Sequence, residues 1–251
     1  MKLTFLGTGA AFTLENYQSN MLIEKNGKKL LIDCGSDIRF ALRDIKLSSN
    51  DIDAIYLSHP HADHLGGMEY MAFTTFFNPN KKPIMLFGED GVLTEAWDHS
   101  LRGGLKSIQG KRVRLSDYFD ITRVGKNSSF IWEGTEFNIV QVCHIMDGYA
   151  IVNSYGLMFK GDNDKTVFIT TDTQFAPSQL TTFYDQADII FHDCETSPFK
   201  SGVHAHYDEL MTLDVKTKKK LNLYHYQDGD KPDAKKDGFG GWCKKGQSFE
   251  L

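Results

Sequence analysis

The feature that most constrains the fold is a polar run that follows directly on a strand-like segment. Residues 53–57 read Asp-Ala-Ile-Tyr-Leu, a short apolar run typical of a buried strand, and residues 58–67 read Ser-His-Pro-His-Ala-Asp-His-Leu-Gly-Gly. Pro60 keeps His59 out of helical geometry, so the first part of the run should be extended.

Three imidazoles and one carboxylate within six residues suit a divalent ion such as zinc. His59 and His61 can share one side of the extended segment, while Asp63 and His64 begin a turn aimed at a second point. We therefore predict two neighbouring metal ions rather than one. The alternative is a His-rich turn without a ligand, which fits a lone histidine better than four ligand-type residues at one strand end.

The same pattern recurs along the chain, where apolar strand-like segments end in His or Asp. His144 closes the segment 136–144, Asp172 follows 166–171, and His225 follows 220–224. Because a layered α/β scaffold presents such residues at one edge of its sheets, we expect one shared site. Asp33 ends the segment 29–33, where it either orients a metal-binding histidine or caps the helix expected over 37–46.

The remaining pattern predicts an α/β protein with a single domain over residues 1–251. Asn26-Gly27 predicts a hairpin between 20–24 and 29–33. Further strands are expected at 2–6, 83–87, 130–132 and 187–195, two short strands within 148–160, and helices at 68–77 and 90–101, whereas 102–130 is weakly patterned.

Composition excludes several classes of protein. The net charge of −5 gives no general attraction to a polyanion, so no stable nucleic-acid partner is expected. No apolar stretch approaches the length of a membrane span, and the apolar run at the N-terminus is too short for a signal peptide. The four cysteines show no paired spacing, which favours a reducing, cytoplasmic setting.

The run from His59 to His64 resembles the His-x-His-x-Asp-His signature of the metallo-β-lactamase-fold hydrolases. The order of Asp33, this signature, His144, Asp172 and His225 is similar to that superfamily over nearly the whole chain. The resemblance implies a four-layer αββα sandwich that holds two Zn²⁺ ions, with Mn²⁺ as an alternative. It assigns one ion to His59, His61 and His144, the other to Asp63, His64 and His225, and a bridging position to Asp172.

Within the superfamily, residues 5–10 (Phe-Leu-Gly-Thr-Gly-Ala) and 153–156 resemble ribonuclease Z and its cyclic-nucleotide phosphodiesterase relatives. Ribonuclease Z typically inserts a long arm that grips tRNA, in bacterial forms between the positions matching His144 and Asp172, but only 27 residues separate them here. Residues 237–247 also resemble the arm-less anti-Pycsar phosphodiesterases, which degrade cyclic mononucleotides used as immune signals. This likeness implies a homodimeric phosphodiesterase that converts 3′,5′-cyclic mononucleotides to 5′-nucleotides.

The same resemblance directs attention to a catalytic histidine near the C-terminal end. The His-Glu-Ala-Thr sequence of ribonuclease Z is replaced here by His-Asp-Cys-Glu-Thr at 192–196. His204 lies nearest the family's later catalytic histidine, and we expect it to be the general acid, since the alkoxide leaving group of a cyclic phosphate needs a proton. His206 is the fallback, Asp63 is the other catalytic candidate, and a cap on the helix beginning at 207 is the structural alternative for this loop histidine.

Two further questions stay open at this level. Tyr149 and Tyr155, and with them Phe199 and Tyr226, are candidates for contacting a base, although core packing explains each equally well. The competing functions are a tRNA 3′-processing endonuclease or another hydrolase of the fold, and a non-catalytic nucleotide-binding protein. Since all seven ligand positions are filled, a decayed site is the weaker hypothesis.

Overall fold

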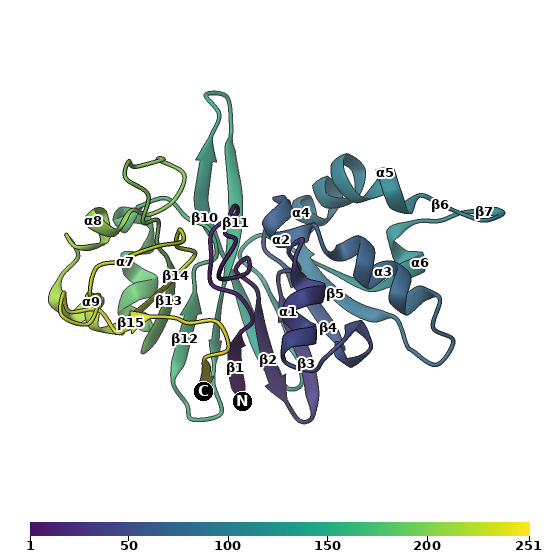
Figure 1. Cartoon of the computed structure of the whole chain (residues 1–251), viewed down its shortest axis with the longest axis horizontal. Coiled ribbons are helices and arrows are strands. Elements are labelled where there is room, and N and C mark those ends of the chain that lie inside the picture. Colours follow the sequence, from purple (N-terminus) through teal and green to yellow (C-terminus); the bar gives the residue numbers. More distant parts are fainter.

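The short apolar runs form the strands of two facing β-sheets in the computed structural model, which describes residues 1–251 (Figure 1). The first sheet has the strand order β16-β1-β2-β3-β4-β5-β8. Its strands are β1 (Lys2–Phe5), β2 (Met21–Lys25), β3 (Lys28–Ile32), β4 (Ala54–Leu57), β5 (Ile84–Glu89), β8 (Phe119–Val124) and β16 (Ser248–Glu250).

The second sheet has the order β15-β14-β13-β12-β11-β10-β9. Its strands are β9 (Ser129–Trp132), β10 (Thr135–Met146), β11 (Ile151–Lys160), β12 (Thr166–Ile169), β13 (Ile189–Asp193), β14 (Leu221–Tyr224) and β15 (Gly241–Trp242). A separate two-stranded ribbon pairs β6 (Ser107–Ile108) with β7 (Lys111–Arg112).

Helices flank the pair of sheets on both outer sides (Figure 1). Beside the first sheet lie α1 (Ile38–Asp44), α2 (Ala62–Leu65), α3 (Met68–Phe76), α4 (Asp90–Glu95), α5 (Arg102–Leu105) and α6 (Leu115–Tyr118). Beside the second lie α7 (Pro177–Gln186), α8 (Tyr207–Leu210) and α9 (Val215–Lys220). The chain also has a 3₁₀ turn, η1 (Ser49–Asp51), and a π-helical segment, η2 (Ala96–Leu101). The four layers confirm the predicted αββα sandwich.

Two apolar clusters hold the layers together. The larger one joins residues of both sheets and of the helices beside the first sheet, and the smaller one lies beneath α7 and α8. Phe5 of β1 and Phe191 of β13 meet across the two sheets with ring centroids 5.3 Å apart. Burial of such aromatic rings is the main stabilising contribution of each residue.

Parallel pairing places the predicted site residues at one edge of the molecule. Strands β3, β4, β5 and β8 run parallel to one another, as do β12, β13, β14 and β15. The carboxyl ends of parallel strands lie at the same edge of a sheet, so the residues that follow β3, β4, β12 and β14 converge. The two chain termini lie at the opposite end (Figure 1).

The structure corrects several predicted elements. Residues 151–160 form one continuous strand, β11, rather than two short ones, because β10 pairs with it from Ile151 to Phe159. The weakly patterned region 102–130 contains a full strand, β8, at the edge of the first sheet. The hairpin of β10 and β11 projects beyond the body of the molecule (Figure 1). No helix has the length and apolar character needed to cross a membrane.

Candidate metal centre

The segment after β4 is shaped by its proline and by close backbone packing. His61 is extended, with φ −78° and ψ 152°, and α2 begins directly after it, as the sequence predicts. The loop after β3 presses against this turn, since the Cys34 amide donates to the His64 carbonyl at 2.6 Å. A Cβ on Gly35 would lie 2.2 Å from the Asp63 carbonyl oxygen, so only glycine permits this approach.

Three histidines bring ring nitrogens together on one side of this turn. His61 Nδ1 lies 3.0 Å from His59 Nε2 and 3.1 Å from His144 Nε2. Ligand nitrogens about 2.0 Å from a tetrahedral zinc ion stand roughly 3.3 Å from one another, which is close to these separations. Burial lowers the pKa of all three imidazoles, so they are neutral at neutral pH, the form that binds a metal.

His144 reaches this group from inside a strand rather than from its end. The register of β10 against β11 shifts between Cys143 and Ile145, so His144 occupies a β-bulge, and β10 continues to Met146. A bulge turns a side chain away from the regular alternation of the strand. The prediction that His144 closes its strand is therefore wrong in detail, although its side chain does reach the site.

Asp63, His64 and His225 form the second group, and Asp172 lies between the two. The Nε2 atoms of His64 and His225 are 3.1 and 3.4 Å from Asp63 Oδ2. Asp172 Oδ2 lies 3.2 to 3.7 Å from the Nε2 atoms of four histidines, two from each group: His59, His64, His144 and His225. One carboxylate oxygen is thus shared between two sets of ligand atoms.

The donor set fits a metal-binding site. The ligand atoms of His59, His61, His144 and Asp172 all lie within 4.8 Å of one another, as do those of Asp63, His64, Asp172 and His225. His64 Nε2 and Asp172 Oδ1 are buried without a hydrogen-bond partner, a costly arrangement that a cation would relieve. Although burial alone would lower the pKa of His64 and His225, the Asp172 carboxylate and its acidic neighbours raise both above the ordinary value. A cluster in which protons on His64 and His225 balance the charge of ionised buried carboxylates is chemically suited to exchange those protons for metal ions.

Asp33 supports this cluster, as one of its two predicted roles requires. Its Oδ2 lies 2.7 Å from His64 Nδ1, and its two oxygens accept hydrogen bonds from the Ser58 amide and hydroxyl. This contact leaves His64 Nε2 to face the other ligands. The capping alternative is wrong, because Asp37 occupies the N-cap position of α1.

The structure separates the two loop histidines. His204 joins the cluster, with its Nδ1 2.8 Å from Asp193 Oδ2 and 3.9 Å from Asp172 Oδ2. Burial would lower the pKa of His204, but the Asp193 carboxylate raises it above the ordinary value. His206 instead caps α8, accepting from the Asp208 amide and contacting the Ser197 carbonyl through Nε2. The fallback assignment of His206 as a catalytic residue therefore has no support in the geometry.

Asp193 is the residue of the cluster that the sequence analysis missed. It ends β13 as a polar residue after an apolar run, which is the same signal that identified Asp172. Besides contacting His204, its Oδ1 lies 3.4 Å from His225 Nδ1. Asp193 therefore links the loop histidine to the second group of ligands.

The four aromatic candidates for substrate contact lie in different environments. Tyr155 is 2% exposed in the larger core, and Tyr226 is buried with its hydroxyl bonded to the Cys243 carbonyl, so neither ring reaches the site. Tyr149 is fully exposed near the tip of the β10–β11 hairpin, and Phe199 is exposed in the loop after β13. The prediction that Tyr155 contacts substrate is corrected by this burial.

A cavity of about 520 Å³ opens onto the cluster. Its walls contain residues from both groups of ligands, His204, and the loop after β1: Ala11, Phe12, Gln18, His61, Ala62, Asp63, His144, Ile145, Asp172, Val203 and His204. Its size is typical of a small-molecule site.

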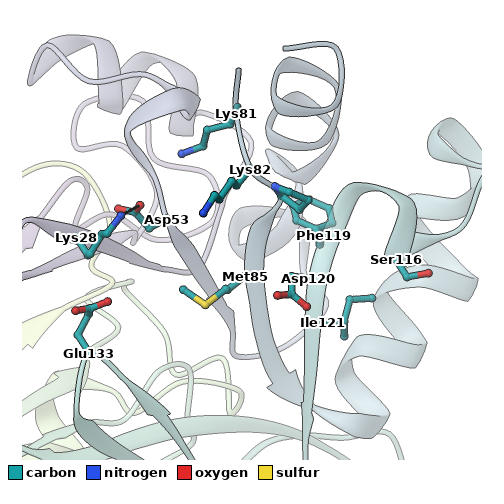
Figure 2. Close-up of a pocket in the computed structure, with 11 residues that line it drawn as sticks. Lys28, Asp53, Lys81, Lys82, Met85, Ser116, Phe119, Asp120, Ile121 and Glu133 are labelled. Carbon is teal, nitrogen blue, oxygen red and sulfur yellow. Dashed lines mark hydrogen bonds and ion pairs between the residues drawn. The ribbon is translucent and has the colours of Figure 1, made fainter. Parts of the chain in front are cut away.

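A second hollow, of about 680 Å³, shares no residue with the cluster (Figure 2). Lys28 and Asp53 at its wall form an ion pair, and Lys81 donates to the carbonyls of Asn50 and Ile52. Two of its three lysines therefore already have acceptors within the chain, and acidic residues such as Asp120 line it as well. This arrangement gives no reason to place a phosphate there.

The fold and the paired clusters define a protein of the metallo-β-lactamase fold. Among solved structures, the metallo-β-lactamase fold protein YhfI from Bacillus subtilis superposes with a TM-score of 0.76 at 19% identity, covering 100% of this chain and 98% of that one. The family model described as "Anti-Pycsar protein Apyc1" matches residues 1–249. The chain belongs to this family.

Two relatives of that family show how widely the likeness extends. The anti-Pycsar protein Apyc1 of Paenibacillus harenae is 36% identical over 230 residues, which is 91% of this chain and 90% of the relative. The protein of the same name from Bacillus phage vB_BveM-Goe7 is 32% identical over 262 residues, covering 100% of this chain and 98% of the relative. The resemblance noted in the sequence is thereby confirmed at the level of the family.

Proposed function

We propose that this chain is a dinuclear metal-dependent phosphodiesterase that opens 3′,5′-cyclic mononucleotides to 5′-nucleotides and so silences a cyclic-nucleotide antiviral signal. The observation that carries the proposal is the meeting of two ligand groups through Asp172, with His204 beside them at the same cavity. The name of the family, anti-Pycsar, supports the choice of signal.

His59, His61 and His144 would hold one ion and Asp63, His64 and His225 the other, with Asp172 between them; zinc suits this donor set and manganese is the alternative. When bound, the ions supply Lewis-acid charge to the phosphoryl oxygens and activate water. Every other step falls to the protein itself.

His204 has the position and protonation of a general acid. Asp193 binds its Nδ1, and its Nε2 has no hydrogen-bond partner. Because the Asp193 carboxylate raises the pKa of His204, the protonated imidazole is favoured, and it can give its proton to the ribose O3′ as the bond from phosphorus to O3′ breaks. The phosphate then stays on the 5′ oxygen, and the product is a 5′-nucleotide.

A side-by-side assay of cyclic mononucleotides and precursor tRNA tests this function. We expect the wild type to hydrolyse the cyclic nucleotides. His204→Ala should lower kcat by about 10²- to 10⁴-fold with its metal content unchanged. His99→Ala is the matched control, because His99 is an exposed helical histidine away from the cluster.

Three results would contradict the proposal. Cleavage of the tRNA with the cyclic nucleotides left intact would favour the tRNA-processing alternative, in spite of the strands β11 and β12 that occupy the position of the arm. Depletion of free nucleotide that persists after chelation would favour a non-catalytic binder. Loss of metal in His204→Ala would make His204 a ligand instead of a proton donor. The homodimer and the cytosolic location stay predictions of the family resemblance, and sedimentation of the purified chain checks the first.

A further inference from the structure

Phe12 is an exposed aromatic residue at the mouth of the cluster. Its side chain is 94% exposed, yet it lines the same cavity as His61, Asp63 and His204. A single exposed apolar residue needs no explanation by itself. Phe12 differs because it is the only Phe, Tyr or Trp on the wall of this cavity, whereas Tyr149 and Phe199 lie outside it.

The backbone directly before Phe12 is held by two hydrogen bonds. The Ala10 amide donates to the Tyr226 carbonyl at 2.9 Å, and Gln18 Nε2 donates to the Ala11 carbonyl at 3.1 Å. The ring therefore stands in solvent on an anchored backbone.

The half-buried carboxylate of Asp228 fixes the following residues of the loop. The Asp228 carboxylate accepts from the Thr13 hydroxyl, from the Leu14 and Glu15 amides at 2.6 and 3.2 Å, and from Asn16 Nδ2 at 2.7 Å. Such preorganisation lowers the entropic cost of binding a ligand against the ring.

We propose that Phe12 is the stacking surface for the base of the cyclic nucleotide, a substrate-positioning role that rests on the proposed function. The histidines and carboxylates of the cluster can engage only the phosphate and the ribose, so a base needs a flat apolar partner elsewhere on the wall. Stacking depends little on the identity of the base, because every base has a π-face. Phe12 therefore contributes affinity to purine and pyrimidine substrates alike, and other residues set any preference among them.

The test compares Phe12→Ala with Leu14→Ala. Leu14 is the matched control, since it is 95% exposed, lies two residues away in the same loop, and does not line the cavity. Each variant is assayed on a panel of 3′,5′-cyclic mononucleotides and on 1-O-methylribose 3′,5′-cyclic phosphate, which has no base. Metal content is measured in parallel.

We expect Phe12→Ala to raise KM for each cyclic nucleotide by about 5- to 150-fold, with kcat within about twofold. Turnover of the base-free compound and the metal content should not change, and Phe12→Tyr should restore KM. An unchanged KM, or an equal loss on the base-free compound, overturns the role of Phe12 while leaving the proposed function standing. A wild type that hydrolyses none of the cyclic nucleotides overturns the proposed function, and this role with it.

Discussion

Removing the Asp33 carboxylate should weaken both the fold and its hold on metal. Asp33 is buried and contacts three hydrogen-bonding groups: the Ser58 amide at 2.9 Å, the Ser58 hydroxyl at 2.8 Å and His64 Nδ1 at 2.7 Å. In Asp33→Ala the hydroxyl can turn to His59 Nδ1, which lies 3.0 Å away, but the amide and the imidazole lose their acceptor. At roughly 1–3 kcal/mol for each buried group left unsatisfied, the free energy of unfolding should fall by about 2–6 kcal/mol.

The variant Asp33→Asn separates the effect on stability from the effect on metal affinity. Asparagine keeps an oxygen for the Ser58 amide and tolerates the left-handed backbone of this position, where φ is +62°. Its amide nitrogen replaces the oxygen that faces His64, so the loss of stability should be about half that of the alanine variant. Metal affinity should nevertheless fall about 10- to 100-fold in both variants, since the orientation of His64 is lost.

The assay is urea unfolding in the presence of a chelator, combined with competition for metal against a chromophoric chelator. Chelation during unfolding keeps metal binding from contributing to the measured stability. Asp185→Asn, an exposed change on α7 at a carboxylate without a hydrogen bond or ion pair, is the control and should leave both quantities unaltered. If Asp33→Asn bound metal as tightly as the wild type, the inference that Asp33 orients His64 would be refuted.

Two further predictions concern protons and packing. Neighbouring carboxylates raise the pKa of His64 and His225 above the ordinary value, so a metal ion must displace their protons and metal affinity should decrease as the pH falls. Calorimetry in buffers of different ionisation enthalpy should detect this proton release. A binding enthalpy that does not depend on the buffer would contradict the prediction. Gly35→Ala should destabilise the fold by roughly 1–3 kcal/mol and weaken metal binding, because the new Cβ would meet the Asp63 carbonyl. Gly103→Ala is the control, because a Cβ there has open space, and it should be neutral. Equal melting temperatures for the two variants would contradict this packing effect.

The sequence predicted most of the cluster because an apolar run followed by His or Asp indicates where a strand ends. His59, Asp172 and His225 each follow an apolar run, and parallel pairing of those runs brings their ends to one edge. Asp193 carries the same signal at the end of β13, where the chain departs from the His-Glu-Ala-Thr sequence of ribonuclease Z. Here the elementary pattern was more informative than the family signature.

Other features depend on tertiary contacts that no local pattern contains. The bulge at His144 arises from how β10 pairs with β11. Tyr149 and Tyr155 belong to the same hairpin, yet Tyr149 is exposed near its tip and Tyr155 is buried in the larger core. Likewise, Phe12 belongs to the site only because Asp228, more than 200 positions later, holds its loop in place.

Backbone strain identifies the same edge independently of any signature. Asp33, Thr171 and His225 all have positive φ, at +62°, +55° and +64°, and each lies just past the end of a strand that leads into the cluster. For a β-branched residue such as Thr171 this conformation costs about 1–3 kcal/mol, so the surrounding structure must impose it. The turn at Thr171 directs the next residue, Asp172, to the point between the two ligand groups. If β12 instead continued as a regular strand, its side chains would alternate between the two faces of the sheet. Unfavourable backbone geometry at three converging strand ends serves to place side chains, and it marks a functional centre independently of the His-x-His-x-Asp-His signature.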